Sequence, residues 1–126
     1  MADVMPVGFH GKFCCLVQGD VHTWLIQSLV EATASHPVSE VPLSELDHHL
    51  DTNGWFDEGR KPTLRAIADH WKRMQSVDLS FPIIISKEFG LMDGMHRLMK
   101  AHATGQKTIK AVLLDETPAP DTIAPR

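Results

Sequence analysis

The sequence is poor in cysteine, has no long apolar run and carries no excess of basic residues. Its only cysteines, Cys14 and Cys15, are neighbours, and two thiols without a distant partner are typical of a reducing compartment. No apolar run approaches the ~20 residues that cross a bilayer, and residues 1–11 lack the basic and apolar regions of a secretory signal. We therefore expect a cytoplasmic protein that does not engage a membrane.

The charge balance argues against nucleic acid as a partner. Lysine and arginine together number 12 against 16 aspartates and glutamates, for a formal net charge of −4. Proteins that bind nucleic acid usually present a basic face, because neutralising phosphates supplies most of their non-specific affinity. The longest basic run here is Lys72-Arg73. We expect a small-molecule substrate or a nucleotide as the partner instead.

Length and composition predict one domain. A chain of 126 residues, 43% of them hydrophobic, can bury one sizeable core but not two. We assign this domain to residues 1–116, with residues 1–40 as an N-terminal extension of it. Residues 117–126 contain three prolines and few side chains to bury, so they are predicted to form a flexible tail.

Hydrophobic periodicity predicts an α+β domain (α/β-type), with a small mixed β-sheet and packed helices. The helix over 63–76 is expected to bury one stripe, formed by Leu64, Ile67, Ala68, Trp71 and Met74 or Gln75. In chain order we expect a strand at 12–17, a helix that begins after an N-cap at Asp20 and ends before Pro37, an extended stretch at 38–43, a short helix at 44–50, the helix at 63–76, an apolar central strand at 82–85, a short strand at 91–92, a helix up to 104 and a strand at 108–114.

The most informative feature is the turn Asp93-Gly94-Met95-His96-Arg97, which joins a predicted strand to a predicted helix. Gly94 has no Cβ, so the backbone can bend sharply and a ligand can approach it closely. The first turn of a helix carries partial positive charge, and basic residues there are unfavourable unless an anion lies nearby. His96 and Arg97 therefore indicate an anion site. A purely structural role, in which Arg97 pairs with Asp93 and His96 caps a carbonyl, explains the same residues equally well.

From about residue 41 to residue 115 the chain resembles the ParB/sulfiredoxin superfamily. ParB-type domains have a Gly-Glu-Arg-Arg turn before a helix, a small residue seven positions after the glycine and a second glycine eleven positions after it. The matching residues here are Gly94, Arg97, Ala101 and Gly105. Sulfiredoxins carry Gly-Cys-His-Arg, which Gly94, His96 and Arg97 match.

This resemblance implies a fold and a ligand. In these families the turn grips nucleotide phosphates, so a nucleotide of the ATP/ADP or CTP class is the implied cofactor and Mg²⁺ a further candidate. The implied cofactor-binding residues are Gly94, Met95, His96 and Arg97.

Departures from the superfamily pattern limit what carries over. Met95 stands where sulfiredoxins have their catalytic cysteine, and a thioether cannot form the thiolate that their chemistry needs. Met95-His96 also replaces the Glu-Arg of the ParB turn, which disfavours CTP binding of the ParB type. The chain has no room for ParB's helix-turn-helix and dimerisation domains. We therefore expect neither thiol-based sulfiredoxin chemistry nor DNA segregation.

Three residues are candidates for a catalytic role. Asp93 could orient Arg97 or a metal ion. His70, on the predicted helix 63–76, titrates near neutral pH and could act as a general base, although a structural histidine explains it as well. Glu45 is one of several carboxylates in 45–58 that could serve as a phosphotransfer base or a magnesium ligand. The sequence does not choose among them.

No protein-held metal site is predicted. Residues 49–60 imitate the middle of a calcium-binding loop, but His49 and Arg60 stand where the flanking carboxylates belong. The eight histidines include no His-x-x-x-His pair, and no Cys-x-x-Cys occurs, so a zinc site is not expected either.

These features leave three functions open. The first is an enzyme, a transferase or hydrolase, that carries out phosphotransfer or hydrolysis on a small molecule. The second is a non-catalytic module in which the same turn binds a nucleotide or another anion and regulates a partner. The third, a nuclease-like or DNA-binding role, is disfavoured by the acidic charge balance. The substrate and the oligomeric state do not follow from the sequence.

Overall fold

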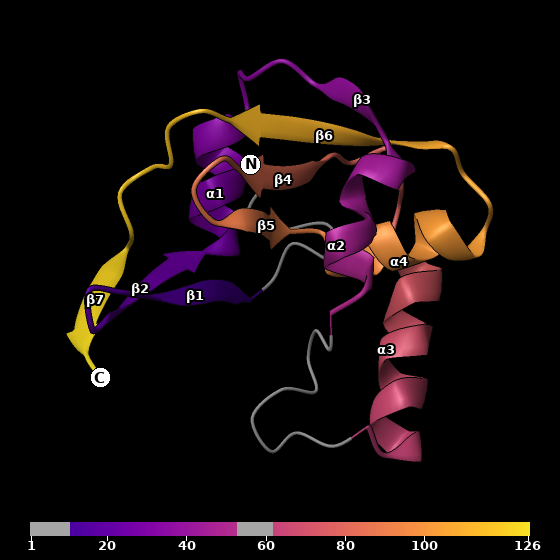
Figure 1. Ribbon diagram of the computed structural model, residues 1–126, viewed down its shortest axis with the longest axis horizontal. Helices are drawn as coiled ribbons and strands as arrows, with labels where there is room; N and C mark the ends of the chain where they lie inside the picture. The colour runs from indigo at the N-terminus through magenta and orange to yellow at the C-terminus, as the bar shows by residue number, and fades with distance from the viewer. Residues whose placement is uncertain (1–10, 53–61) are drawn as a thin grey trace, which may run out of the picture.

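The computed structural model describes residues 11–52 and 62–126, which form two β-sheets with helices packed around them (Figure 1). This confirms the predicted α+β class. In the described ranges, no helix combines the length and the apolar character of a membrane span. The elements in chain order are β1 (Lys12–Val17), β2 (Asp20–Leu25), α1 (Ile26–Thr33), β3 (Ser39–Pro42), the 3₁₀ helix η1 (Leu43–Leu46), α2 (Asp47–Leu50), α3 (Leu64–Ser76), β4 (Ile83–Ser86), β5 (Gly90–Asp93), α4 (Met95–Ala103), β6 (Thr108–Leu114) and β7 (Thr122–Pro125).

The larger sheet has four strands in the order β3-β6-β4-β5 and is mixed, as expected. β6 pairs parallel with β4 and antiparallel with β3, and β5 pairs antiparallel with β4. The isoleucine-rich β4 is apolar on both faces because both faces are covered. Ile84 packs in a cluster with Ile26 and Leu29 of α1. Ile83 packs in a second cluster with Leu98 of α4.

The smaller sheet, β1-β2-β7, corrects the prediction of a helix that begins after Asp20. Residues 20–25 instead form β2, which pairs antiparallel with β1 and leaves Gln18 and Gly19 as a two-residue loop. Both loop residues have positive φ, 51° and 90°, as tight hairpin turns that match the strand twist require. The helix begins only at Ile26. The apolar residues that recur at helical spacing, from Trp24 to Val30, thus include the last two residues of a strand as well as residues of the helix that follows.

The prediction of a flexible tail is also wrong for its last part, because β7 pairs antiparallel with β2. Upstream of β7, the carbonyl of Pro118 accepts a hydrogen bond from Nε1 of Trp24 at 2.8 Å. The Asp121 carboxylate accepts one from the backbone N–H of Leu25 at 2.7 Å and one from the hydroxyl of Ser28 at 2.8 Å. Composition misled here because backbone and capping hydrogen bonds, rather than buried side chains, hold the segment in place.

Helix α3 lies where it was predicted, but its apolar stripe is not buried. Leu64 is 87% exposed and Trp71 is 55% exposed, whereas Met74 is buried. The helix packs against α4 (Figure 1). His70 forms a hydrogen bond to His96 across this contact, so the side of α3 that carries His70 and Met74 faces the body of the protein. Met74 is thus the part of the expected stripe that is buried, and the rest of the stripe lies on the solvent side.

We predict that Asp121→Ala lowers the free energy of unfolding by about 1–2 kcal/mol, because the start of α1 loses its carboxylate acceptor. Asp115→Ala removes an exposed carboxylate just after β6 and serves as the matched control. It should change the free energy of unfolding by less than about 0.5 kcal/mol. Urea denaturation measures both variants. Equal effects would show that Asp121 does not cap the helix.

Candidate functional site

The predicted turn is a tight junction between β5 and α4, with Gly94 as the N-cap of the helix. Gly94 has a φ of 109°, a conformation that other residues rarely adopt. A Cβ at this position would lie 2.8 Å from Cβ of Ile83 and 3.2 Å from Nη2 of Arg97. Two independent features therefore require glycine at position 94: the backbone conformation and the close approach of β4.

A buried ion pair spans this junction. Nη2 of Arg97 donates to Oδ2 of Asp93 at 2.6 Å, and Nη1 of Arg97 donates to the carbonyl of Pro82 at 2.8 Å. Arg97 is only 2% exposed and Asp93 is also buried. Burial raises the pKa of the Asp93 carboxyl, and the adjacent guanidinium opposes that rise. Removing one partner of such a pair typically costs about 3–5 kcal/mol.

The junction borders a pocket of about 330 Å³. Its described lining comes from β1, the start of α1, the C-terminal part of α3, β5 and the start of α4. The ionisable residues of this lining are Lys12, Arg73, Asp93, His96 and Arg97. Basic side chains thus outnumber the one carboxylate, which is itself paired with Arg97.

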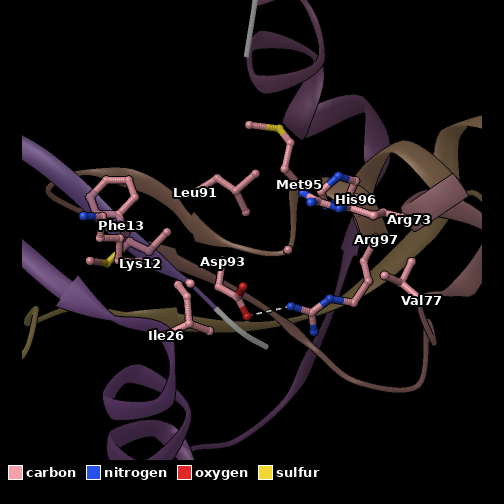
Figure 2. Close-up of a pocket in the computed structure, with 13 residues that line it drawn as sticks. Lys12, Phe13, Ile26, Arg73, Val77, Leu91, Asp93, Met95, His96 and Arg97 are labelled. Atoms are coloured by element: carbon pink, nitrogen blue, oxygen red, sulfur yellow. Dashed lines mark hydrogen bonds and ion pairs between the residues drawn. The ribbon is translucent and has the colours of Figure 1, made fainter. Parts of the chain in front are cut away.

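The pocket has two chemically different ends (Figure 2). Figure 2 shows the apolar side chains of Phe13, Ile26 and Leu91, together with Lys12, toward one end and Arg73 and His96 toward the other. The Asp93 carboxylate lies between these ends, and the dashed line in the figure marks its contact with Arg97. A ligand with one anionic end and one apolar end matches this arrangement.

His96 is hydrogen-bonded to a second histidine from α3. Nδ1 of His70 and Nε2 of His96 lie 3.0 Å apart, and the two rings are stacked with their centroids 5.2 Å apart. Burial, followed by the nearby His70, Arg73 and Arg97, lowers the pKa of His96 to about 4. Burial also lowers the pKa of His70, with Arg73 acting in the same direction and Asp69 against it. Both rings are therefore neutral at neutral pH.

The structure brings most of the predicted site residues together. The lining of the pocket includes Asp93, Gly94, Met95, His96 and Arg97. His70 is not part of the described lining, but it reaches the pocket through its hydrogen bond to His96. Glu45 is exposed on η1 and does not belong to that lining. Residues 53–61, which contain other candidate carboxylates, lie outside the described ranges.

Sequence reasoning missed the pocket residues that come from distant parts of the chain. Lys12 and Phe13 belong to β1, and Arg73 belongs to the C-terminal half of α3. The sequence contains a weak indication of Arg73, because Lys72-Arg73 is its longest basic run. Lys12 and Phe13 had none, because only the tertiary fold brings β1 next to β5.

The described lining does not fit a protein-held Mg²⁺. Mg²⁺ prefers carboxylate oxygens in an octahedral arrangement, and the one carboxylate here, Asp93, is already bound by Arg97 at 2.6 Å. In the ranges that the structure describes, no group of three or more His, Cys, Asp or Glu side chains could hold a metal ion.

We predict that Gly94→Ala lowers the free energy of unfolding by about 2–4 kcal/mol, since it adds a clash with Ile83 to a strained backbone. Gly105→Ala is the matched control, because Gly105 also has positive φ (74°) but a Cβ added there would meet no atom within 4 Å. Its cost should be about 1 kcal/mol, the backbone strain alone. Chemical denaturation compares the two, and equal costs would contradict the close packing at the junction.

We also predict that the fold loses stability as the pH falls from about 7 to about 5. His96 has a lower pKa in the folded chain than its ordinary value of 6.5, so in this window the unfolded chain binds more protons. His96→Asn should flatten the dependence of the melting temperature on pH. In His102→Asn, on the exposed side of the same helix, the melting temperature should depend on pH as it does in the parent protein. A parent slope retained in His96→Asn would contradict this assignment.

Comparisons with known proteins do not add a family to this picture. No protein-family model matches the chain, and neither the curated proteins nor the solved structures contain a match to it. The resemblance of the Gly94 turn to ParB and sulfiredoxin proteins therefore stays a prediction. The function of the pocket has to be argued from its own geometry and chemistry.

Proposed function

We propose that the pocket at the Gly94 junction binds a phosphate-bearing small molecule or a nucleotide. The observation that carries this proposal is a cavity at the N-terminal end of α4 whose lining includes Arg73 and Arg97 at one end and Lys12 toward the other. The first amides of a helix have no acceptor within the helix, and the helix dipole favours an anion there. Because Arg97 already neutralises Asp93, the positive charge nearest to a phosphate at this end comes from Arg73, and Lys12 adds positive charge at the Phe13 end.

The two ends of the pocket support a ligand of mixed character. A volume of about 330 Å³ is near the lower limit of typical small-molecule sites, so the ligand is small. The phosphate would lie at the Arg73 and His96 end, and a planar group would lie against Phe13. A nucleotide of the ATP/ADP or CTP class meets this description, and the ParB/sulfiredoxin-like turn favours the same ligand class.

We favour an enzyme that carries out phosphotransfer or hydrolysis on a small molecule. His96 is the side chain best placed to move a proton, because it lines the pocket and is hydrogen-bonded to His70. Asp93 is less suited to act as a base, since Arg97 holds its carboxylate. Glu45 lies outside the described lining, so it has no part in this proposal.

A non-catalytic, nucleotide- or anion-binding regulatory module is the alternative. The observation that favours it is the ion pair of Asp93 with Arg97, which leaves the described lining without an unpaired carboxylate for base catalysis. A nuclease-like or DNA-binding role agrees poorly with the net charge of −4.

We place this activity in the cytoplasm. Cys14 and Cys15 are both free, as is typical of a reducing compartment. Cys14 is exposed, and an oxidising compartment would leave it open to oxidation.

Binding can be tested by calorimetry and thermal shift with inorganic pyrophosphate, ADP and CTP, each with and without Mg²⁺. A ligand present at ~100 times its dissociation constant should add about 2.7 kcal/mol to the free energy of unfolding. Arg73→Gln should weaken binding about tenfold or more, because it removes a charged donor, and Lys12→Gln should weaken binding less, because Lys12 lies at the other end of the pocket. Release of phosphate or ADP over a panel of small-molecule acceptors then separates an enzyme from a binding module.

Lys72→Gln is the matched control for Arg73→Gln, because Lys72 is the exposed neighbour of Arg73 on α3 and is absent from the described lining. It should bind the same ligands as the parent protein does. If Arg73→Gln and Lys72→Gln bind equally well, the phosphate does not lie where we propose. Arg97 is unsuitable for this test, since its buried ion pair makes any loss of binding indistinguishable from unfolding.

A further inference from the structure

The His70–His96 pair is unusual in that two imidazoles share one hydrogen bond at the wall of a basic pocket. The two bonded nitrogens, Nδ1 of His70 and Nε2 of His96, are 3.0 Å apart. Each neutral imidazole carries one proton on two nitrogens, so one ring must donate and the other accept. A third proton turns the pair into an imidazolium and an imidazole that can keep the same hydrogen bond. The hydrogen bond between the rings is therefore compatible with one additional proton on the pair.

The surroundings of the pair oppose this additional proton as long as no anion is present. On α3, Arg73 repels a charged ring and Asp69 attracts it. On α4, Arg97 repels it as well, and this guanidinium is held by Asp93 at the end of β5. Lys12, from β1, adds a further positive charge to the pocket. An anion bound among these cations would cancel the repulsion that they exert on the pair.

We propose that the His70–His96 pair takes up one proton from solvent when a dianion binds in the pocket, so that one ring becomes an imidazolium that donates to the other across the hydrogen bond between them. This inference rests on the proposed anion binding, and it adds that pH regulates that binding. The proton comes from the buffer, and no bond of the ligand is broken. Binding is therefore strengthened by acid, and the pocket selects ligands that remain doubly charged when the pH falls.

Two further features support the pair as the site of uptake. His96 lines the pocket, whereas His70 stands behind it and is outside the described lining, so the pair extends from the ligand into the α3–α4 contact. Burial already lowers the pKa of both rings, which leaves the pair neutral and able to accept a proton at physiological pH.

The test uses inorganic sulfate, which stays a dianion throughout the range and brings no proton of its own. Calorimetric titrations near pH 6, in two buffers with different ionisation enthalpies, give the number of protons taken up per sulfate bound. We expect a value that approaches one for the parent protein. The affinity for sulfate should rise by up to about tenfold for each unit that the pH falls toward the pKa of the free pair.

Two variants and a control assign the proton. His96→Asn should abolish the uptake, and His70→Phe should reduce it while leaving the lining of the pocket unchanged, because the charged ring loses its acceptor. His102→Asn, on the exposed side of α4, should behave as the parent protein does. Uptake that persists in His96→Asn would assign the proton to another group, such as Asp93, and would overturn the proposal.

A measurement on the unmodified protein tests the proposal even if the variants fail to fold. NMR titration of the histidine ring protons should show the pKa of His70 or His96 rising when sulfate is present. Sulfate binding with no proton uptake and no such shift overturns this inference but leaves the anion site intact. If sulfate, pyrophosphate, ADP and CTP all fail to bind at any pH, the proposed function fails, and this inference fails with it.

Discussion

The buried contact between Asp93 and Arg97 is the constraint on which the pocket depends. It ties the last residue of β5 to the first turn of α4, and the second donor of Arg97 ties that turn to Pro82, just before β4. Three elements thus meet at one guanidinium, around a glycine that has no room for a side chain. Two charges taken out of water are tolerated only because each satisfies the other. The position of the α4 N-terminus follows from this arrangement.

The same interaction changes the role of Arg97. An arginine in the first turn of a helix suggests a ligand contact, and Arg97 does line the pocket, but its guanidinium is also part of the internal packing. The structural explanation of the turn is therefore correct in pairing Arg97 with Asp93, and anion binding at the turn stays a proposal. Lys12 and Arg73 are better placed than Arg97 to bind a ligand without a role in folding. Both are exposed and come from other elements.

Helix α3 connects folding to the chemistry of the pocket. Its contact with α4 is made through a polar pair, His70 and His96, and through Lys100 of α4, whose ammonium donates to the carbonyl of Val77 at 2.8 Å. A helix held in this way does not need to bury its apolar stripe, which explains why Trp71 remains half exposed. The consequence of a polar contact is a dependence on pH, because the unliganded fold favours the neutral form of both rings.

Local signals determined much of this protein from the sequence alone. The α+β class, the β6 strand, the α3 and α4 helices and the glycine bend all follow from periodicity, caps and turn residues, which act over a few neighbours. The grouping of Gly94, His96 and Arg97 at the bend also follows from the sequence, because the three residues lie within four positions of one another. Only the tertiary structure decided that β2 is a strand, that the tail pairs with it, and that Lys12, Arg73 and His70 join the bend. These depend on contacts between residues far apart in the chain, and no pattern within one segment encodes which partner a strand edge or a helix face will meet.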